Sequence, residues 1–253
     1  MGKRFFHKLS FILLALFILP SGVFANYIRP NDFMDKTGAS RIAEIKRFQA
    51  RNNLEVTGGL NPRTEELLYN PQFIAYDIVE KPPTDGYWIV VNKSRRILTL
   101  YQGKQSIGKY PIAVGKSSSP TPSYQGKIIN KFVNPSWKGK VPGNHPNNPL
   151  GHRWMGLYVG GRSGYGIHGT IKPYEIGTYA SAGCIRMFNY DIETHVFPKM
   201  KVHDPVWIGT DEQLASWGVR QIIDTVAEVP ENPQEPIIEE PSVEREAVTV
   251  LEF

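Results

Sequence analysis

Two short stretches decide how this chain folds and reacts: Gly166-Ile167-His168-Gly169-Thr170 and Ser181-Ala182-Gly183-Cys184-Ile185-Arg186-Met187. Cys184 is the only cysteine in the chain, so it cannot form an internal disulfide. A thiolate is a strong nucleophile, and a nearby histidine is its usual activating partner. Gly183 permits a tight turn that can direct the Cys184 amide at a developing oxyanion. The two stretches therefore indicate a cysteine nucleophile loop.

The first 25 residues have the pattern of a secretory signal peptide. Lys3, Arg4 and Lys8 precede the apolar run Leu9–Leu19, and Val23-Phe24-Ala25 suits cleavage after Ala25. The run is too short to span a bilayer comfortably. We therefore expect export to the bacterial cell envelope, wall or periplasm, without stable membrane insertion after cleavage. An uncleaved anchor is the alternative.

Charge is unevenly distributed along the chain. The net charge is +5; the first 25 residues contribute +3 and residues 228–253 contribute −7, which leaves +9 for residues 26–227. A basic exported body suits a polyanionic envelope surface. Residues 228–253 are rich in Pro and Glu and poor in large apolar groups, so we expect a disordered acidic tail. Export and the lack of a nucleic-acid-binding motif exclude nucleic acid as a partner.

A small helical segment precedes the main body. Ser40 is placed to cap a helix over Arg41–Asn53, and Asn61-Pro62 opens a second helix that ends at Tyr69. A Phe-Gln pair, a Thr-Gly turn and a Thr before the second helix resemble the second half of the small three-helix peptidoglycan-binding module. The resemblance implies a partial module over residues 38–71. Wall binding and simple packing against the next domain both stay open.

The following region has a β pattern. Runs rich in β-branched and aromatic residues alternate with turn residues, and Gly and Pro punctuate residues 115–164 without a helical period. These features predict a mainly β fold. The expected strands are Tyr87–Asn92, Arg95–Tyr101, Gln105–Val114 and Pro205–Gly209, with one helix at Asp191–Met200.

Motifs in this region resemble the L,D-transpeptidase (YkuD-like) catalytic domain. They are Tyr110–Gly115, Thr121-Pro122, Tyr165–Thr170 and Ser181–Met187, followed by Asn189 and Asp191. The resemblance implies a catalytic domain over residues 86–210, an L,D-transpeptidase-type β-sandwich with one or two short helices. Ala182 departs from the family pattern, where many members carry histidine.

The resemblance also implies the catalytic roles. Cys184 would attack the bond after the third residue of a peptidoglycan tetrapeptide stem, with His168 as general base. The carbonyl of Gly169 would orient the histidine, and the amides of Gly183 and Cys184 would form the oxyanion hole. A cationic His168 would hold the Cys184 thiol pKa well below its free value. No cofactor is expected.

Three further residues are candidates for substrate binding: Arg186, Ser181 and Tyr158. Arg186 is suited either to a substrate carboxylate or to a structural salt bridge. Tyr158, with Trp154 and Met155, fits either a substrate groove or the core. His145 and His152 lack further ligands at metal spacing, so no metal site is expected.

Several functions fit these residues to different degrees. An exported L,D-transpeptidase would join donor and acceptor stems in 3→3 cross-links. The same site with water as acceptor would be an L,D-carboxypeptidase, and a non-catalytic wall-binding protein is the alternative from another class. Papain-like wall hydrolases place Cys before His, the reverse of this chain. Sortases separate the two residues by a longer stretch.

Overall fold

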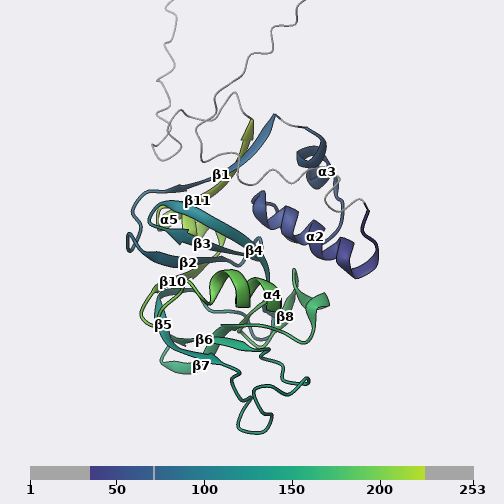
Figure 1. The fold of residues 1–253 in the computed structure, drawn as a ribbon. Helices are drawn as coiled ribbons and strands as arrows, with labels where there is room; N and C mark the ends of the chain where they lie inside the picture. The colour runs from purple at the N-terminus through teal and green to yellow at the C-terminus, as the bar shows by residue number, and fades with distance from the viewer. Residues whose placement is uncertain (1–34, 71, 226–253) are drawn as a thin grey trace, which may run out of the picture.

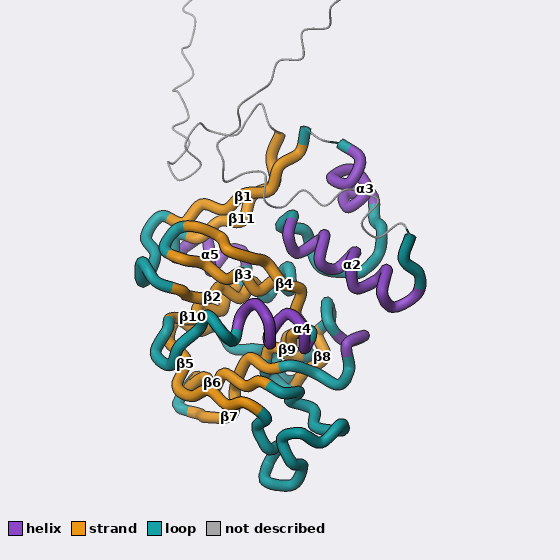
Figure 2. Tube along the Cα trace, in the orientation of Figure 1, coloured by secondary structure: helices purple, strands orange, loops and turns teal. Residues whose placement is uncertain are grey.

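The computed structural model describes residues 35–70 and 72–225 (Figures 1 and 2). The mainly β fold with a helical N-terminal segment, predicted from the sequence, is confirmed. The expected signal peptide and acidic tail lie outside the described residues.

The helices are α2 (Gly38–Arg51), α3 (Pro62–Tyr69), α4 (Asn189–Asp191) and α5 (Asp211–Ser216), with a 3-10 turn η2 (Pro173–Glu175) and a π turn η3 (Ile192–Val196). The strands are β1 (Phe73–Val79), β2 (Tyr87–Asn92), β3 (Ile97–Gln102), β4 (Gln105–Gly115), β5 (Tyr124–Val133), β6 (Arg153–Val159), β7 (Arg162–His168), β8 (Tyr179–Ser181), β9 (Ile185–Met187), β10 (Pro205–Gly209) and β11 (Val219–Thr225).

The main sheet closes on itself. Its strands follow the order β3-β2-β10-β5-β6-β7-β9-β4, and β4 also pairs with β3, which completes a ring; β8 adds to β4. Most neighbours are antiparallel, whereas β2–β10, β4–β8 and β7–β9 are parallel. Closure removes the exposed strand edges that would otherwise invite pairing with other chains.

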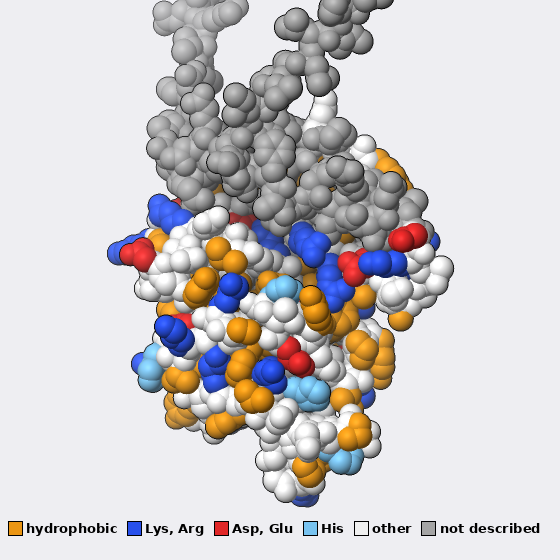
Figure 3. Space-filling model, in the orientation of Figure 1, with side chains coloured by type: hydrophobic (Ala, Val, Ile, Leu, Met, Phe, Trp, Pro, Cys, Tyr) orange, Lys and Arg blue, Asp and Glu red, His pale blue; other side chains and the backbone are white. Residues whose placement is uncertain are grey.

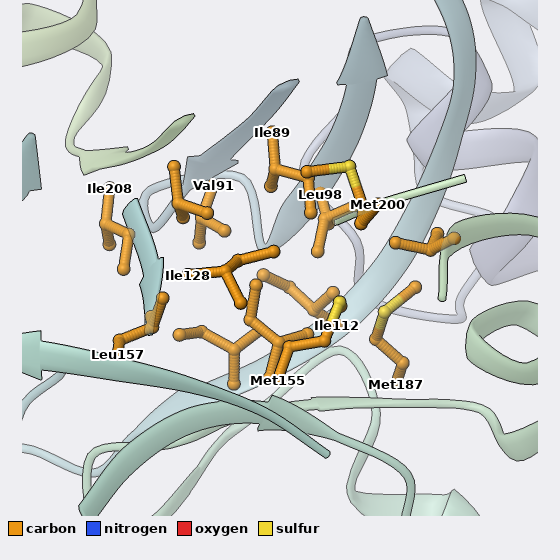
Figure 4. Close-up of a cluster of buried hydrophobic side chains, with 14 of the residues drawn as sticks. Ile89, Val91, Leu98, Ile112, Ile128, Met155, Leu157, Met187, Met200 and Ile208 are labelled. Carbon is orange, nitrogen blue, oxygen red and sulfur yellow. The ribbon is translucent and has the colours of Figure 1, made fainter. Parts of the chain in front are cut away.

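The ring encloses the main core. Alternate residues of β6, Met155, Leu157 and Val159, face inward, which the period of two along a strand requires. Figure 4 shows Met155 and Leu157 among other buried side chains of this core, including Ile89, Leu98, Ile112, Ile128, Met187 and Ile208 from the strands and Met200 from the segment after η3. Full burial of one such side chain contributes about 1.5–3 kcal/mol.

The two N-terminal helices form as the sequence predicts, with one difference at a cap. Asn61 caps α3, because its Oδ1 accepts a hydrogen bond of 2.9 Å from the Thr64 N–H. Ser40 does not cap α2: the helix begins at Gly38, and the Ser40 hydroxyl donates to the Thr37 carbonyl at 2.8 Å. The predicted Ser40 cap is therefore wrong.

Strands β2 and β10 have the predicted bounds, whereas other boundaries differ. β3 begins at Ile97 because Arg96 adopts a positive φ of 59° in the preceding turn. The helix expected at Asp191–Met200 is a single turn, α4, continued by the π turn η3. The spacing of apolar residues over a segment this short does not distinguish a single helical turn from a regular helix of ten residues.

The folded body continues beyond the expected end at residue 210. Helix α5 has a capping box formed by Thr210 and Gln213, and β11 follows and pairs with β1 in a separate two-stranded sheet. Phe73 lies opposite Thr225, and Val79 lies opposite Val219. The segment before the catalytic region and the segment after it thus form one structural unit.

Candidate active site

Cys184 lies in the short loop between β8 and β9. Gly183, just before it, has a φ of 115°, which only glycine adopts readily. A Cβ at this position would lie 2.7 Å from Tyr165 Cε1, so the space also excludes a side chain. Gly183 therefore sets the path of the backbone into the nucleophile.

Hydrogen bonds from several hydroxyl groups hold this loop. The Ser181 hydroxyl donates to the Cys184 carbonyl at 2.5 Å and accepts from the Gly183 N–H at 3.0 Å. Thr121 Oγ1 donates to the Gly183 carbonyl at 2.9 Å, and Ser119 Oγ donates to the Ala182 carbonyl at 2.9 Å. The nucleophile loop is thus held by the hydroxyl of its own Ser181 and by two hydroxyl groups of the segment 119–121.

These bonds change two expectations from the sequence. Ser181, a candidate for substrate binding, borders the same cavity as Cys184, but it is only 1% exposed and its hydroxyl is hydrogen-bonded within the loop. The Gly183 amide was expected in the oxyanion hole, but it donates to Ser181. Thr121 was noted only as part of a motif, and Ser119 was missed. A serine far from Cys184 in sequence gives no local signal of this contact.

His168 ends β7 and is buried, with 3% of its surface exposed. Its Nδ1 lies 2.6 Å from the Gly169 carbonyl oxygen, the contact that the resemblance implies. A carbonyl only accepts, so Nδ1 carries the hydrogen and Nε2 is left as the basic nitrogen. The ring stacks on Trp154 of β6, with centroids 5.7 Å apart and an interplanar angle of 21°. The backbone and one aromatic ring thus set the orientation of His168.

Asn189 supports the backbone beside this histidine. Its Oδ1 accepts a 2.8 Å hydrogen bond from the Thr170 N–H. A side chain on Gly169 would collide with the same Oδ1 atom. Asn189 was part of the sequence motif without an assigned role, and the structure places it behind the orienting carbonyl.

Cys184 and His168 line one cavity of about 520 Å³. Its lining comes from strands β5, β6 and β7, from the nucleophile loop and its flanking strands, and from the loop 134–152. The loop projects from the end of the molecule opposite β1 and β11 (Figure 1). The buried Asn148 side chain braces it by donating to the carbonyls of Pro135 at 2.7 Å and Pro142 at 3.1 Å. The lining residues include Phe132, Trp137, Lys138, Leu150, Trp154, Ala182 and Arg186.

Burial dominates the electrostatics of Cys184 and His168, the candidate catalytic pair. The pKa of His168 is lowered to about 4, mainly by burial and also by the Arg186 cation, while the Gly169 and Leu150 carbonyls oppose the shift. Burial also raises the pKa of the Cys184 thiol, against the lowering effects of the Gly166 N–H and Arg186. These shifts run opposite to the expected cationic histidine with a low-pKa thiolate, and they favour a neutral imidazole and a neutral thiol in the free protein.

Arg186 both lines the cavity and pairs with an acidic residue. Its Nη1 forms an ion pair with Glu175 Oε2 of η2. The Arg186 Nε is buried and has no hydrogen-bond partner among the described residues. The structural salt bridge considered from the sequence is present, and the side chain still borders the site. The sequence does not single out Glu175, because a contact between residues eleven positions apart across two short strands leaves no periodic pattern.

Tyr158 lies outside this cavity. It is 53% exposed and lines a separate open groove with Tyr124 and Trp207. Trp154, four residues earlier on the same face of β6, borders the catalytic cavity. Four residues along a strand span about 13 Å, which separates the two aromatic rings. The prediction that Tyr158 contacts substrate in this cavity is not supported by its position.

Neither histidine considered for a metal belongs to a ligand cluster. His145 Nδ1 accepts from the Asn147 N–H at 3.1 Å, and His152 Nδ1 lies 3.5 Å from Glu193 Oε1. Within residues 35–70 and 72–225, no group of three or more His, Cys, Asp or Glu side chains is placed to hold a metal ion. In the same residues, no helix is both long enough and apolar enough to cross a membrane.

Comparison with known proteins assigns the family. A family model described as the L,D-transpeptidase catalytic domain (YkuD) matches residues 86–208. The putative L,D-transpeptidase YqjB of Bacillus subtilis is 35% identical over 137 residues, which cover 53% of this chain and 77% of that protein. The chain belongs to the L,D-transpeptidase (YkuD) family.

Other members of the L,D-transpeptidase family give similar matches. The putative L,D-transpeptidase YkuD of Bacillus subtilis is 36% identical over 132 residues, covering 52% of this chain and 72% of that protein. Among solved structures, the catalytic domain of the E. faecium L,D-transpeptidase aligns with 20% identity and a TM-score of 0.41. That alignment covers 51% of this chain and 100% of the other.

Proposed function

We propose that this protein is an exported L,D-transpeptidase that forms 3→3 cross-links between peptidoglycan stems through a thioester on Cys184. The observation that carries the proposal is the placement of Cys184 and His168 on one cavity in a member of this family. Lys and Arg side chains are spread over the visible face of the body (Figure 3), which suits a polyanionic wall. Donor and acceptor stems are the proposed partners.

In the first half-reaction, a tetrapeptide stem donates its acyl group. The Cys184 sulfur attacks the carbonyl carbon between the third residue and the terminal D-Ala, while neutral His168 takes the thiol proton. The carbon–nitrogen bond then breaks, and His168 returns this proton to the departing D-Ala amine. A thioester on Cys184 and free D-Ala result. A neutral starting pair suits this sequence, because His168 must begin without its second proton.

In the second half-reaction, an amine of a neighbouring stem attacks the thioester carbonyl. His168 removes a proton from that amine and gives it to the leaving Cys184 sulfur, which restores the thiol. The carbon–sulfur bond breaks as the new amide forms. The products are a 3→3 dimer and free enzyme. Water in place of the amine would give a tripeptide, the product of an L,D-carboxypeptidase.

The Cys184 N–H is the proposed donor to the developing oxyanion. Gly183 contributes the positive-φ turn, since its own N–H donates to Ser181. Arg186 is the proposed contact for a substrate carboxylate, through guanidinium N–H groups that Glu175 does not occupy. Ser181 acts as a brace of the loop in this proposal.

Defined muropeptides test the reaction directly. The purified protein should convert disaccharide-tetrapeptides into a 3→3 dimer, identified by its mass and fragmentation, and Cys184→Ala should not. Tetrapeptides with diaminopimelate and with lysine at the third position would show which one is used. A tripeptide without dimer would identify a carboxypeptidase instead.

Acylation by a carbapenem tests the nucleophile independently of the acceptor. The strained lactam carbonyl needs a thiol and an oxyanion hole, so wild-type protein should gain one carbapenem mass on Cys184. His168→Ala should react about 10²- to 10⁴-fold more slowly, the usual contribution of a general base. An adduct on Cys184→Ala, or none on wild type together with no muropeptide product, would overturn the proposal.

A further inference from the structure

The helical segment Gly38–Tyr69 packs against two stretches of chain that lie next to the candidate active site, one at Phe188–Asp191 and one at Tyr174–Ile176. We propose that this segment, hereafter the buttress, positions the active site by holding the two backbone stretches that orient His168 and Arg186. The inference rests on the proposed function in taking Cys184 and His168 as the reacting pair. It assigns the segment a role within the reaction, whether or not it also binds wall.

The first line of contacts leads from the buttress to His168. Arg47 Nη2 of α2 lies 3.1 Å from Asp191 Oδ1, and its guanidinium carbon lies 4.9 Å from the centre of the Phe188 ring. The Asp191 side chain is 3% exposed, so this ion pair is largely out of water. Phe188 and Asp191 stand on either side of Asn189 and fix it between two anchored neighbours.

Asn189 then transmits this position to the catalytic histidine. Its Oδ1 accepts a hydrogen bond from the Thr170 N–H. The same atom lies so close to Gly169 that a Cβ on this glycine would collide with it. The Gly169 carbonyl is the atom that fixes the His168 tautomer. A displacement of Asn189 would therefore shift the backbone between Gly169 and Thr170, and with it the carbonyl that orients the His168 imidazole.

The second line of contacts leads from the buttress to Arg186. Lys46 Nζ of α2 donates to the Tyr174 carbonyl at 3.4 Å. Arg96 joins the buttress to the same loop, because its Nη2 donates to the Val56 carbonyl at 3.0 Å and its Nε donates to the Gly177 carbonyl at 2.8 Å. These contacts bracket η2, whose Glu175 pairs with Arg186 at the edge of the cavity.

Apolar packing joins the two lines. Ala43 of α2 packs against a buried cluster made of Ala113, Ile176 and Phe188. Ile176 directly follows η2, and Phe188 directly precedes Asn189. One face of α2 thus touches both supporting stretches at once. A general-base geometry displaced by about 1 Å can lose up to 10²-fold in rate, so support at this distance is enough to affect the reaction.

Two arginines of the buttress provide a matched comparison. Arg47 pairs with Glu44 at 3.0 Å and lies over the Phe188 ring; Arg63 pairs with Glu66 at 2.5 Å and lies 4.8 Å over the Phe73 ring. Only Arg47 contacts the catalytic body through Asp191. Arg47→Met and Arg63→Met therefore each remove a helix ion pair and an arginine–phenylalanine contact. Only Arg47→Met also removes the ion pair with Asp191 that links the buttress to the site.

The primary readout is alkylation of Cys184 by iodoacetamide, which requires no wall substrate. We expect Arg47→Met to react about tenfold more slowly than wild type at pH 7, and Arg63→Met to react at the wild-type rate. In a His168→Ala background, Arg47→Met should have no further effect, because it acts through the imidazole. An equal slowing in both backgrounds would show general destabilisation and overturn the proposal.

The tautomer of His168 gives a second readout that a purely structural role would not move. Nitrogen-15 spectra of wild type and Arg63→Met should show the Nδ1–H form, whereas Arg47→Met should show a mixture. If loss of the partner of Asp191 prevents folding, Arg47→Met with Asp191→Asn removes the unpaired charge. Lys46→Met tests the second line alone, through weaker binding of a carbapenem. Wild-type rates and spectra in every folded variant would overturn the proposal.

These outcomes are separable from those of the proposed function. Failure to form any muropeptide product would leave the alkylation rates and the His168 spectra interpretable. Conversely, cross-linking activity with equal alkylation in Arg47→Met and wild type would retain the transpeptidase and reject the buttress.

Discussion

His168 donates its Nδ1 hydrogen to the carbonyl of the next residue, Gly169, across 2.6 Å. The histidine of this site is therefore oriented by its own backbone, and no carboxylate is needed as a third member. Because a carbonyl is neutral, it orients the ring without strongly favouring the cationic form. Burial then keeps the imidazole uncharged.

The pH dependence of acylation follows from this neutral pair. The pKa of His168 is lowered to about 4, so the ring becomes a competent base as the pH rises through that value. The carbapenem acylation rate should rise there and stay nearly flat through neutral pH, with any further rise only above the ordinary thiol range, because burial raises the pKa of Cys184. Rapid-mixing measurements across this range would test it. A single rise centred near pH 8.5 would contradict it.

Thr121 supports the nucleophile loop from behind, and its replacement should slow the chemistry. Thr121 Oγ1 accepts from the Gly115 N–H at 2.8 Å and donates to the Gly183 carbonyl at 2.9 Å. Thr121→Val should lower the acylation rate about tenfold and cost about 1–3 kcal/mol of unfolding free energy. Thr99→Val is the matched control, because Thr99 is buried and bonded to Gln221 away from the site. It should lose stability without losing rate.

Gly183 should not tolerate even a methyl group. Gly183→Ala combines strain at a φ of 115°, about 1–3 kcal/mol, with a contact against Tyr165. We expect a folded protein with acylation reduced by at least about tenfold, measured by mass spectrometry. Gly160→Ala, also at positive φ but with no atom within 4 Å of the new Cβ, should keep the wild-type rate. Equal rates in the two variants would argue against a special role for Gly183.

A buried ion pair that does not line the cavity should contribute strongly to stability. Lys109 Nζ lies 2.5 Å from Asp77 Oδ1, and both side chains are at most 3% exposed. Lys109→Met leaves a buried carboxylate and should lower the free energy of unfolding by about 3–5 kcal/mol in urea titrations. Lys109→Met with Asp77→Asn should recover part of the loss.

The candidate pair, Cys184 and His168, could be picked out from the sequence because both residues stand in local motifs. His168, Cys184 and Gly183 stand in short stretches whose chemistry is fixed by neighbours. Asn61-Pro62 was equally clear, since a cap and a proline at the first helical position act within one turn.

Contacts between distant segments were not readable in the same way. The Glu175–Arg186 pair depends on how a loop folds back, and the β1–β11 pairing joins strands separated by about the whole catalytic body. The pKa of His168 depends on how deeply the tertiary structure buries it, which a motif does not record. Tyr158 is a further example. A tyrosine is typical of a groove lining, but its position along β6 decides which groove it lines, and the sequence alone does not give that position.

The pairing of Phe73 with Thr225 has a consequence for how the molecule can be attached. β1 and β11 lie at one end in Figure 1, and the loop that walls the cavity lies at the other. A surface, label or fusion partner joined beyond Thr225 would therefore hold the protein with its cavity facing outward. Protein immobilised through this end would keep its cavity accessible to a large polymer while it stays attached to the support.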